Sequence, residues 1–245
     1  MFARRVLMFS GLVSFPSLGL GYLKLTNNKD QRHIVLDLDH TLLHSIKLDQ
    51  KYNKYGQFHN MIDQQADFEV LDKYAVHLRR WCIPFIKLMN TIATVHCFTA
   101  ATEDYALQIL DNIDPQREIF QIIKTRKHLQ DIENDIIGKR RYTKNLNHII
   151  NAIQQDDDLD DDTKTKKKIS DLKRILLIDD KRRSFVVNQH ENQEINGIQV
   201  KPFNVNIGQD HILLKCAAII IYRIMNNQHD LTNNNHKNNT RTIIT

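Results

Sequence analysis

Glycine and proline are scarce in this sequence, which has only 7 Gly and 4 Pro among its 245 residues. Average usage would give roughly 29 of the two together, so we expect few turns and many helices. Only three cysteines are present, Cys82, Cys97 and Cys216, and three do not make a disulfide framework. The thiols fit a reducing compartment, and Cys97, which lies inside an apolar run, is predicted to be a small buried thiol.

The sequence also lacks a stripe of basic residues interleaved with aromatic ones, although its net charge is +5 and its pI is near 9.0. Nucleic-acid binding is therefore not expected. Apolar residues make up 41% of the chain and charged residues 26%. These ordinary values argue against a wholly disordered, collagen-like or multi-span membrane protein. The length allows one domain with extensions, or at most two small domains.

The N-terminal segment, residues 1–30, differs in composition from the rest. Arg4 and Arg5 precede an uncharged stretch from Val6 to Leu23. Three interpretations stay open: a secretory signal or signal anchor, a mitochondrial presequence, or an apolar arm packed on the domain. Glycines and a proline in the stretch, and its length near the short limit for spanning, weaken a transmembrane assignment. We expect a targeting role, or membrane association through residues 6–23.

Two polar segments are predicted to lie outside the packed domain, which we place at residues 31–225. Residues 226–245 are rich in Asn and are expected to form a disordered tail. At residues 154–168 an acidic block directly precedes a basic block. A cation or partner site is one interpretation, and a solvated surface insertion is the one we favour. The segment from Asp210 to Met225 is apolar enough for a packed closing helix.

Short β-rich apolar runs alternate with helical segments along the domain. Fully apolar runs of this kind are typical of buried strands in a parallel sheet. The alternation predicts an α/β doubly wound fold, in which ligands bind beyond the carboxyl ends of the strands. The expected strands are His33–Leu38, Thr91–Thr99 and Arg174–Asp180, and the expected helices include Ala75–Met89 and Glu103–Leu110.

Polar side chains end each of the three expected strands. Asp37 and Asp39 end the first, Thr99 the second, and Asp179–Asp180 the third. Four carboxylates at one edge of the sheet repel one another and raise one another's pKa values. A divalent cation relieves this repulsion, and Mg²⁺ binds through a few carboxylates, water and substrate phosphate. One such acid could be a turn residue or a helix cap, but three strand ends of this kind predict a magnesium site.

Five segments carry a resemblance to a known family. The first, IVLDLDHTLLHS, holds the pattern D-x-D-x-T at residues 37–41, directly after an apolar run. The others are CFTAATEDYA, LDNIDPQREIFQ, RYTKNL and ILLIDD, in that order. From about Arg32 to Phe203 the chain closely resembles phosphatases of the haloacid-dehalogenase superfamily. The branch it resembles most is the small C-terminal-domain phosphatases, also called NLI-interacting-factor-like phosphatases.

The resemblance implies a Rossmann-like, mostly parallel sheet without a large cap domain, and a Mg²⁺-dependent phosphatase. Asp37 would be the nucleophile that forms an aspartyl-phosphate. Asp39 would act as general acid and then as general base. Thr41, Thr99 and Lys144 would bind the phosphate. Mg²⁺ would be held by Asp37, the backbone carbonyl of Asp39 and Asp180, with Asp179 close by.

More than one lysine of this sequence could correspond to the motif lysine of the family. In the family the lysine segment lies closer to the last acidic strand, so residues 154–168 would be an insertion here. By position alone Lys164 or Lys166 would be chosen. We choose Lys144, because it lies in the matching sequence RYTKNL, ahead of the apolar helical stretch Leu146–Ile153. An ordinary surface lysine is the alternative interpretation of Lys144.

The resemblance implies a phosphoprotein or phosphopeptide substrate, chiefly phosphoserine or phosphothreonine, with phosphotyrosine left open. Residues 43–74 are polar enough to supply a hairpin or flap beside an open cleft. Arg79 and Arg80 could position phosphate or peptide, although exposed arginines at a helix start are the commoner case. The oligomeric state is not predicted.

Two further functions fit the same fold. A relative serves as the presequence-binding receptor subunit of the mitochondrial inner-membrane translocase, with little or no catalysis, and the apolar N-terminal run suits such an anchored protein. The complete acid–Thr–Lys–acid set argues against a pure binding module. A secreted bacterial effector that acts on host phosphoproteins is a third possibility. Localisation accordingly stays open between a membrane, the cytoplasm and a host cell.

Overall fold

The computed structural model places a large part of the predicted domain. Among the residues that it describes, no helix is both long enough and apolar enough to cross a membrane. The apolar stretch at residues 6–23 and the charged block at residues 154–168 lie outside the described residues. The described residues are 29, 32–48, 66–132, 141–153, 175–185, 197–205, 210–226 and 241–245.

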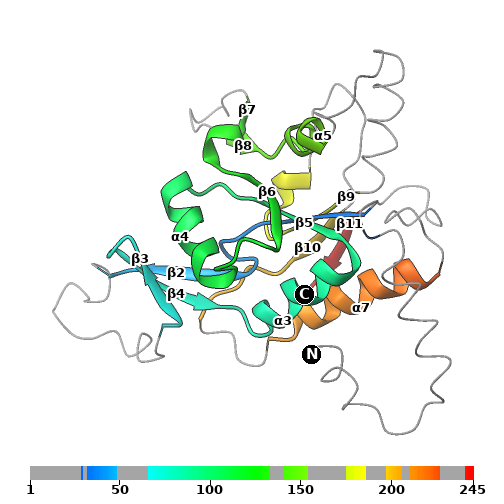
Figure 1. Cartoon of the computed structure of the whole chain (residues 1–245), viewed down its shortest axis with the longest axis horizontal. Coiled ribbons are helices and arrows are strands. Elements are labelled where there is room, and N and C mark those ends of the chain that lie inside the picture. Colours follow the sequence, from blue (N-terminus) through cyan, green and yellow to red (C-terminus); the bar gives the residue numbers. More distant parts are fainter. Residues whose placement is uncertain are drawn as a thin grey trace, which may run out of the picture.

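A six-stranded sheet forms the centre of the molecule, in the order β11-β10-β9-β1-β5-β6 (Figure 1). Every pairing within this sheet is parallel. The central strands are mostly apolar and almost wholly buried because both of their faces are covered, as the sequence predicts. The strands are β1 (His33–Leu36), β5 (Thr94–Phe98), β6 (Phe120–Lys124), β9 (Ile175–Asp179), β10 (Gly197–Val200) and β11 (Arg241–Ile244).

Helices cover both faces of the central sheet, which confirms the doubly wound α/β prediction. Successive side chains of β1 point to opposite faces. Ile34 and Leu36 pack with α3 (Cys82–Ile92), α4 (Glu103–Ile113) and α7 (Ile212–Met225). On the other face Val35 packs with α5 (Asn147–Ile153). Figure 1 shows α3 and α7 side by side below the sheet and α5 above it.

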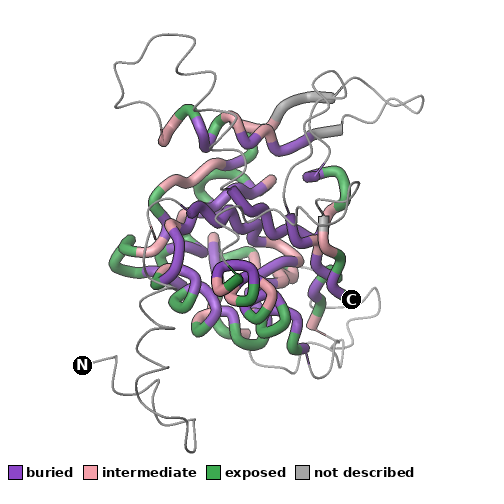
Figure 2. The backbone as a smooth tube through the Cα atoms, turned by 90° about the vertical axis from the view of Figure 1, so that its right-hand side faces the viewer, coloured by how far each residue is buried: buried purple, intermediate pink, exposed green. Residues whose placement is uncertain are grey.

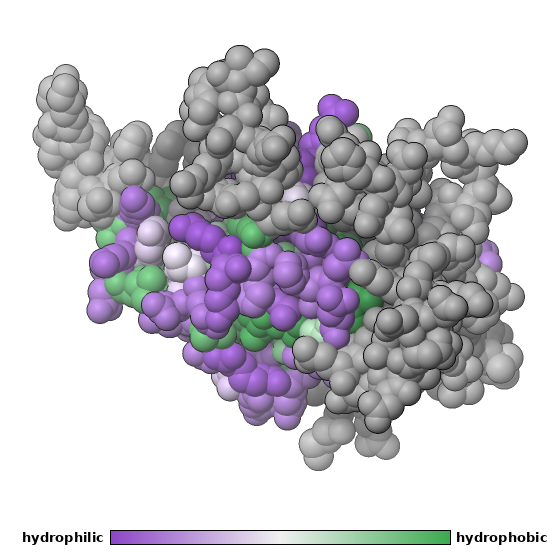
Figure 3. Space-filling model, turned by 90° about the horizontal axis from the view of Figure 1, so that it is seen from above, coloured by the Kyte–Doolittle hydropathy of each residue, from purple (hydrophilic) through white to green (hydrophobic). Residues whose placement is uncertain are grey.

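The buried part of the chain runs through the sheet and the inner sides of the helices, and exposed residues surround it (Figure 2). Seen from above, the described surface is mainly hydrophilic, with hydrophobic side chains in a narrow band and small groups (Figure 3). Cys82, Cys97 and Cys216 are free and buried, so the prediction for Cys97 is confirmed. No large cap domain is formed by the described residues.

A small antiparallel sheet lies beside the main one, in the order β2-β4-β3. It corrects the predicted helix Ala75–Met89, because its first residues form β4 (Tyr74–Leu78) and the helix begins only at Cys82. The apolar residues of this segment suit either element, and two strands distant in sequence supply its hydrogen-bond partners. Trp81, with a φ of 69°, separates strand from helix. The partner strands are β2 (Leu43–Lys47) and β3 (Phe68–Val70).

The predicted strands His33–Leu38, Thr91–Thr99 and Arg174–Asp180 are each longer than the observed β1, β5 and β9. Thr91 and Ile92 close α3, so β5 begins at Thr94. A short antiparallel pair, β7 (Gln130–Ile132) and β8 (Arg141–Thr143), precedes α5. Two short 3₁₀ helices, η4 (Arg126–His128) and η5 (Arg182–Phe185), follow β6 and β9. These short elements carry side chains that reach the candidate site.

The predicted disordered tail is wrong for its last residues. Arg241–Ile244 forms β11, which pairs with β10 and extends the main sheet. Ile244 is buried, and Arg223 of α7 donates a 2.7 Å hydrogen bond to the Thr242 hydroxyl. Two adjacent isoleucines after the Asn-rich stretch supply apolar surface, and β10 otherwise presents unpaired backbone groups at an edge. The closing helix predicted from Asp210 is confirmed as α7.

Candidate active site

Strand register brings the predicted acids to one edge of the sheet. β1 lies between β5 and β9, with Leu36 opposite both Cys97 and Ile178. Asp37 directly follows β1, and its backbone N–H donates to the carbonyl of Ile178. Since adjacent parallel strands here end at the same level, Asp37 lies beside Asp179 on one side and near the end of β5 on the other.

The chain leaves the strand geometry at Asp37, so Asp37 and Asp39 do not share one face. Leu38 accepts backbone hydrogen bonds from Thr41, Leu42 and Leu43, which folds the D-x-D-x-T segment into a tight loop. His40 has a φ of 64°, a left-handed conformation that a non-glycine residue seldom adopts. This turn brings Thr41 back against Asp37.

Thr41 connects the first and last acidic segments. Its hydroxyl donates to Asp37 Oδ2 at 3.3 Å and accepts from the backbone N–H of Asp180 at 3.0 Å. The residue is fully buried. Thr41 therefore holds the loop against the end of β9, and its hydroxyl is occupied within the protein.

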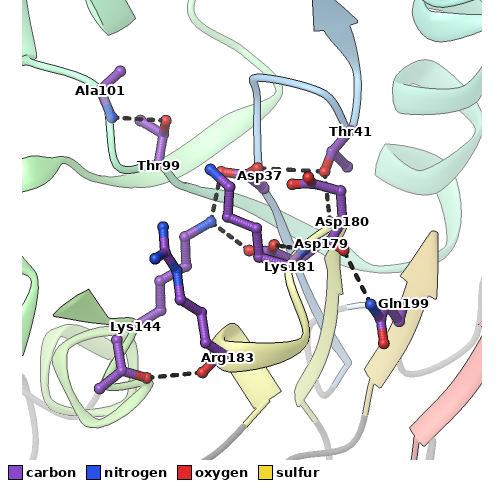
Figure 4. Close-up of polar contacts among 11 residues, drawn as sticks. Asp37, Thr41, Thr99, Ala101, Lys144, Asp179, Asp180, Lys181, Arg183 and Gln199 are labelled. Carbon is purple, nitrogen blue, oxygen red and sulfur yellow. Dashed lines mark hydrogen bonds and ion pairs between the residues drawn. The ribbon is translucent and has the colours of Figure 1, made fainter. Parts of the chain in front are cut away.

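Lys144 lies at the centre of the cluster. Its ammonium nitrogen is 2.5 Å from Asp37 Oδ1 and 2.6 Å from Asp179 Oδ2. The side chain is only 5% exposed, so Lys144 is not a surface lysine. The bond from the Thr143 hydroxyl to the carbonyl of Arg183 ties this segment to η5. Figure 4 shows Lys144 reaching between the two carboxylates.

Three carboxylates at this edge suit a hard cation. Oxygens of Asp37, Asp179 and Asp180 lie within 4.8 Å of one another. Asp180 Oδ1 is buried and has no hydrogen-bond partner among the described residues. A buried carboxylate oxygen without a partner is costly unless a cation or proton satisfies it. The donor set is all oxygen, which fits Mg²⁺.

The electrostatics follow from three acids facing one lysine. Burial raises the pKa of Asp37 to about 7, against the opposing effect of Lys144 and with a further contribution from Asp179. Burial and the charge of Asp179 also raise the pKa of Asp180. Burial alone would lower the pKa of Lys144, but Asp179 and Asp37 together raise it above its usual value. Lys144 is therefore charged. Its single positive charge does not balance the three carboxylates, so the cluster can accept a cation.

Asp39 lies apart from the other acids, and a tyrosine holds its carboxylate. The Tyr105 hydroxyl donates to Asp39 Oδ1 at 2.8 Å and also contacts the Ser45 hydroxyl. Asp39 is partly exposed. Tyr105 was not predicted to be a site residue. It lies in the segment CFTAATEDYA, but its spacing alone does not show that α4 directs it toward Asp39.

Thr99 occupies the end of β5 and is almost fully buried. Its hydroxyl oxygen accepts a 3.1 Å hydrogen bond from the backbone N–H of Ala101, as Figure 4 shows. The O–H proton stays available to a ligand. Continuing the register of β1 and β5 places Thr99 level with Leu38, at the same edge as the acids.

A pocket of about 220 Å³ opens above Asp37 and Lys144. The basic residues that line this pocket were not predicted as site residues, although the letters KRR directly follow the last acidic motif. Arg126 is oriented by a 2.8 Å bond from its Nε to the carbonyl of Ala100. Apart from the two residues of the cluster, the wall includes Ala100, Arg126, Leu129, Lys181, Arg183 and Ser184.

Arg79 supports the acidic loop from behind and is not the exposed arginine that the sequence suggests. Its guanidinium, fully buried, donates to the carbonyl of Thr41 at 2.9 Å and to that of Lys201 at 2.8 Å. It also pairs with Asp210 at 2.8 Å. Asp210 in turn accepts from the backbone N–H of Ile212 at the start of α7. Arg79 thus joins the loop to the rest of the fold and does not contact the pocket.

The family model for NLI interacting factor-like phosphatases matches residues 32–232. The chain belongs to this family. Both the D-x-D-x-T loop and the Asp179–Asp180 pair lie inside the matched range, as does Lys144. The doubly wound sheet and the acidic cluster are therefore features of a family member, and the resemblance predicted from the motifs is confirmed.

Three solved structures are also similar to this chain. Fcp1, an essential RNA polymerase II CTD phosphatase, has 16% sequence identity and a TM-score of 0.43. A fission yeast Fcp1 variant bound to beryllium fluoride has 14% identity and a TM-score of 0.43. Each match covers 91% of this chain and 62% of the Fcp1 chain, so the chain spans about three fifths of their length.

The third is an uncharacterized protein from Listeria monocytogenes serotype 4b. It has 9% identity and a TM-score of 0.40, and the match covers 78% of this chain and 99% of that one.

Proposed function

We propose that this family member is a Mg²⁺-dependent phosphoprotein phosphatase that hydrolyses phosphoserine and phosphothreonine through an aspartyl-phosphate on Asp37. The observation that supports it best is the position of Lys144, which contacts Asp37 and Asp179 at once. A lysine there neutralises the nucleophile and the entering phosphate together. Phosphoryl transfer needs such positioning and charge neutralisation more than elaborate covalent machinery.

In the proposed first step, an oxygen of Asp37 attacks phosphorus and the bond to the leaving oxygen breaks. Asp39 gives its proton to that leaving alkoxide, and the Tyr105 hydroxyl holds the Asp39 carboxyl in place. In this proposal, Lys144 and the O–H group of Thr99 donate hydrogen bonds to the phosphate oxygens whose bonds to phosphorus stay intact. A bound Mg²⁺ would act as a Lewis acid and template at Asp37 and Asp180, with Asp179 close by.

In the second step, water attacks the phosphorus of the aspartyl-phosphate while Asp39 accepts a proton from that water. The bond between phosphorus and the Asp37 oxygen breaks, which releases inorganic phosphate and restores both carboxyl groups to their starting states. In this scheme Thr41 contacts the Asp37 carboxylate but not the phosphate, and Arg79 acts only through the carbonyl of Thr41. They keep the loop that carries the two aspartates against β9.

The test is capture of the intermediate. The protein is incubated with para-nitrophenyl phosphate and Mg²⁺, quenched and reduced with borohydride, which converts an aspartyl-phosphate to homoserine. We expect hydrolysis that chelation of the metal abolishes, and homoserine at position 37 by mass spectrometry. Absence of hydrolysis with Mg²⁺ would contradict the phosphatase proposal, and hydrolysis with the label elsewhere would contradict the assignment of Asp37.

Magnesium affinity is expected to depend on pH. Burial raises the pKa of Asp37 to about 7, so below pH 7 the metal must displace a proton. We therefore expect the association constant for Mg²⁺ to rise about tenfold per pH unit from pH 5 to 7 and then to level off. Calorimetric titration at each pH measures it, with Asp180→Asn expected to weaken binding at every pH. Equal affinity at pH 5.5 and 7.5 would contradict this prediction.

The raised pKa of Asp37 also determines how the stability of the metal-free protein changes with pH. Between about pH 4 and 7 the folded state keeps a proton on Asp37 that the unfolded state has released. The contribution of Asp37 to the free energy of unfolding therefore falls as pH rises through this window. Mg²⁺ should stabilise the protein more at pH 8 than at pH 5, and thermal melts with and without the metal check this.

Replacing Tyr105 with phenylalanine is expected to lower kcat about tenfold, because Asp39 loses the hydrogen bond that orients its carboxyl. The fold should persist, since the ring stays in place. Tyr74→Phe is the matched control: its ring packs edge-on against Tyr105 at 5.2 Å between ring centroids, and it removes a hydroxyl beside the same site. Steady-state kinetics should show a loss for the first variant and not for the second.

A further inference from the structure

Three basic side chains surround the mouth of the pocket above the acidic cluster. Arg126 comes from η4, and Lys181 and Arg183 come from the segment that follows β9. Figure 4 shows the side chain of Lys181 extending toward Asp37 and the side chain of Arg183 running beside that of Lys144. All three line the pocket that Asp37 and Lys144 also line. The reacting groups therefore lie within a strongly positive opening.

In the described part of the chain, these basic groups are not neutralised by neighbouring acids. Among the described residues, no carboxylate forms an ion pair with Lys181, Arg183 or Arg126. Arg126 uses its Nε on the carbonyl of Ala100, which orients the remaining guanidinium nitrogens. Its neighbour Lys127, outside the pocket, is by contrast paired with Glu103 at 2.7 Å.

The site and its opening together carry more positive charge than one bound phosphate would balance. Lys144 and one divalent cation together balance the carboxylates of Asp37, Asp179 and Asp180. A phosphomonoester near neutral pH carries at most two negative charges. The three basic side chains of the opening exceed those two, so the complex with a singly phosphorylated neutral peptide keeps unbalanced positive charge in a partly enclosed site.

We propose that Lys181 and Arg183 form a subsite for a second anionic group of the substrate. The substrates favoured by this subsite are peptides in which an acidic residue or a second phosphate lies close to the phosphoresidue that is hydrolysed. This inference rests on the proposed phosphatase function. An extended peptide advances about 3.3 Å per residue, so the second anion lies within about three residues of the first.

The chemistry of the two side chains fits this role. The planar guanidinium of Arg183 can bind a carboxylate or a phosphate through two parallel hydrogen bonds. Lys181 is half-buried, directly follows Asp180 and lines the pocket, so it lies between the metal-binding acids and the opening. A second anion bound there contacts both cations without displacing Lys144 from Asp37.

The test compares matched phosphoserine peptides. One has alanine at the three positions on either side, and the others carry Asp or a second phosphoserine at one of those positions. For the unaltered protein with Mg²⁺ we expect the best acidic peptide to exceed the neutral one about tenfold in kcat/KM. In the double variant Lys181→Gln, Arg183→Gln, this ratio should fall to near one.

Arg182→Gln is the matched control, since Arg182 is exposed in the same turn of η5 and does not line the pocket. It removes one of the two positive charges that η5 carries, and the preference for acidic peptides should survive it. Loss of preference in this control would show only a general effect of net charge and would overturn the subsite. Thermal melts of all variants check that each is folded.

A binding measurement separates failure of the subsite from failure of the catalytic proposal. Fluorescence anisotropy with labelled acidic and neutral phosphopeptides is carried out on the Asp37→Asn protein, which should not turn them over. Tighter binding of the acidic peptide, lost in the Lys181→Gln, Arg183→Gln background, supports the subsite. Equal kcat/KM for both peptides in the unaltered protein overturns the subsite and leaves the phosphatase standing. Absence of hydrolysis for every substrate overturns the phosphatase itself.

Discussion

Asp37→Asn is expected to lower kcat/KM for para-nitrophenyl phosphate and for a phosphoserine peptide by a factor on the order of 10³ or more. The amide cannot attack phosphorus and form an acyl phosphate. The change also replaces one of the three carboxylates available to a cation at this edge with a neutral amide. Initial rates with saturating Mg²⁺ give the comparison.

Loss of folding cannot account for that result, because the change should not destabilise the metal-free protein. The pKa of Asp37 is raised to about 7 chiefly by burial, so its ionised form weakens the folded state above that pH. Asparagine has no such charge, and the melting temperature at pH 8 without metal should be equal or higher.

The matched control is Asp111→Asn on the exposed surface of α4, where Asp111 pairs with Arg117 at 2.6 Å. It makes the same chemical change outside the site and should keep activity within about twofold, because exposed ion pairs contribute little. Activity of Asp37→Asn above a tenth of that of the unaltered protein would contradict the role of Asp37 as nucleophile.

Lys144→Met is expected to abolish turnover and, unlike Asp37→Asn, to destabilise the metal-free protein. Removing one partner of a buried ion pair costs about 3–5 kcal/mol, because the remaining charges stay buried without compensation. Here Asp37 and Asp179 would both lose their bonds to the ammonium. Denaturant unfolding at pH 8 with a chelator measures the loss.

Mg²⁺ should restore part of the lost stability, because a divalent cation supplies positive charge to the same carboxylates. Lys127→Met is the control: it removes an exposed lysine whose ion pair with Glu103 should contribute less than about 1 kcal/mol. If Lys144→Met unfolded at the same denaturant concentration as the unaltered protein, the charge balance inferred for the cluster would be wrong.

Opposite stability effects at two contacting residues give a test of the whole electrostatic arrangement. Three carboxylates face one ammonium, so removing an acid relieves repulsion and removing the lysine increases it. If Asp37 and Lys144 formed an isolated, balanced ion pair, both substitutions would destabilise the folded state.

The local pattern of the chain was sufficient to predict the main strands and the edge where the acids meet. Ile34, Val35 and Leu36 form an uninterrupted apolar run, which suits a strand covered on both faces. Parallel strands carry their C-terminal residues to one edge, so Asp37 and Asp179 could be placed near each other without coordinates. The motif match then identified Lys144, although its distance from Asp37 is 107 residues in sequence.

Elements whose partners are distant in sequence were harder to predict. Ala75–Leu78 was assigned to a helix because its apolar spacing is compatible with one, yet β2 and β3 supply backbone partners that local spacing does not reveal. Arg241–Ile244 was assigned to a disordered tail because its Asn-rich neighbours dominate the composition. Pairing with β10 makes it a strand.

The sequence by itself determined the α/β class, the family and the position of the D-x-D-x-T loop, because these depend on local apolar runs and a short motif. Only the tertiary structure decided that Tyr105 holds Asp39, that Arg79 supports the loop through the carbonyl of Thr41, and that Lys181 and Arg183 line the pocket. These contacts depend on helix placement and side-chain direction in three dimensions. No spacing along the chain encodes them, since a hydrogen bond requires atoms to meet within about 3 Å.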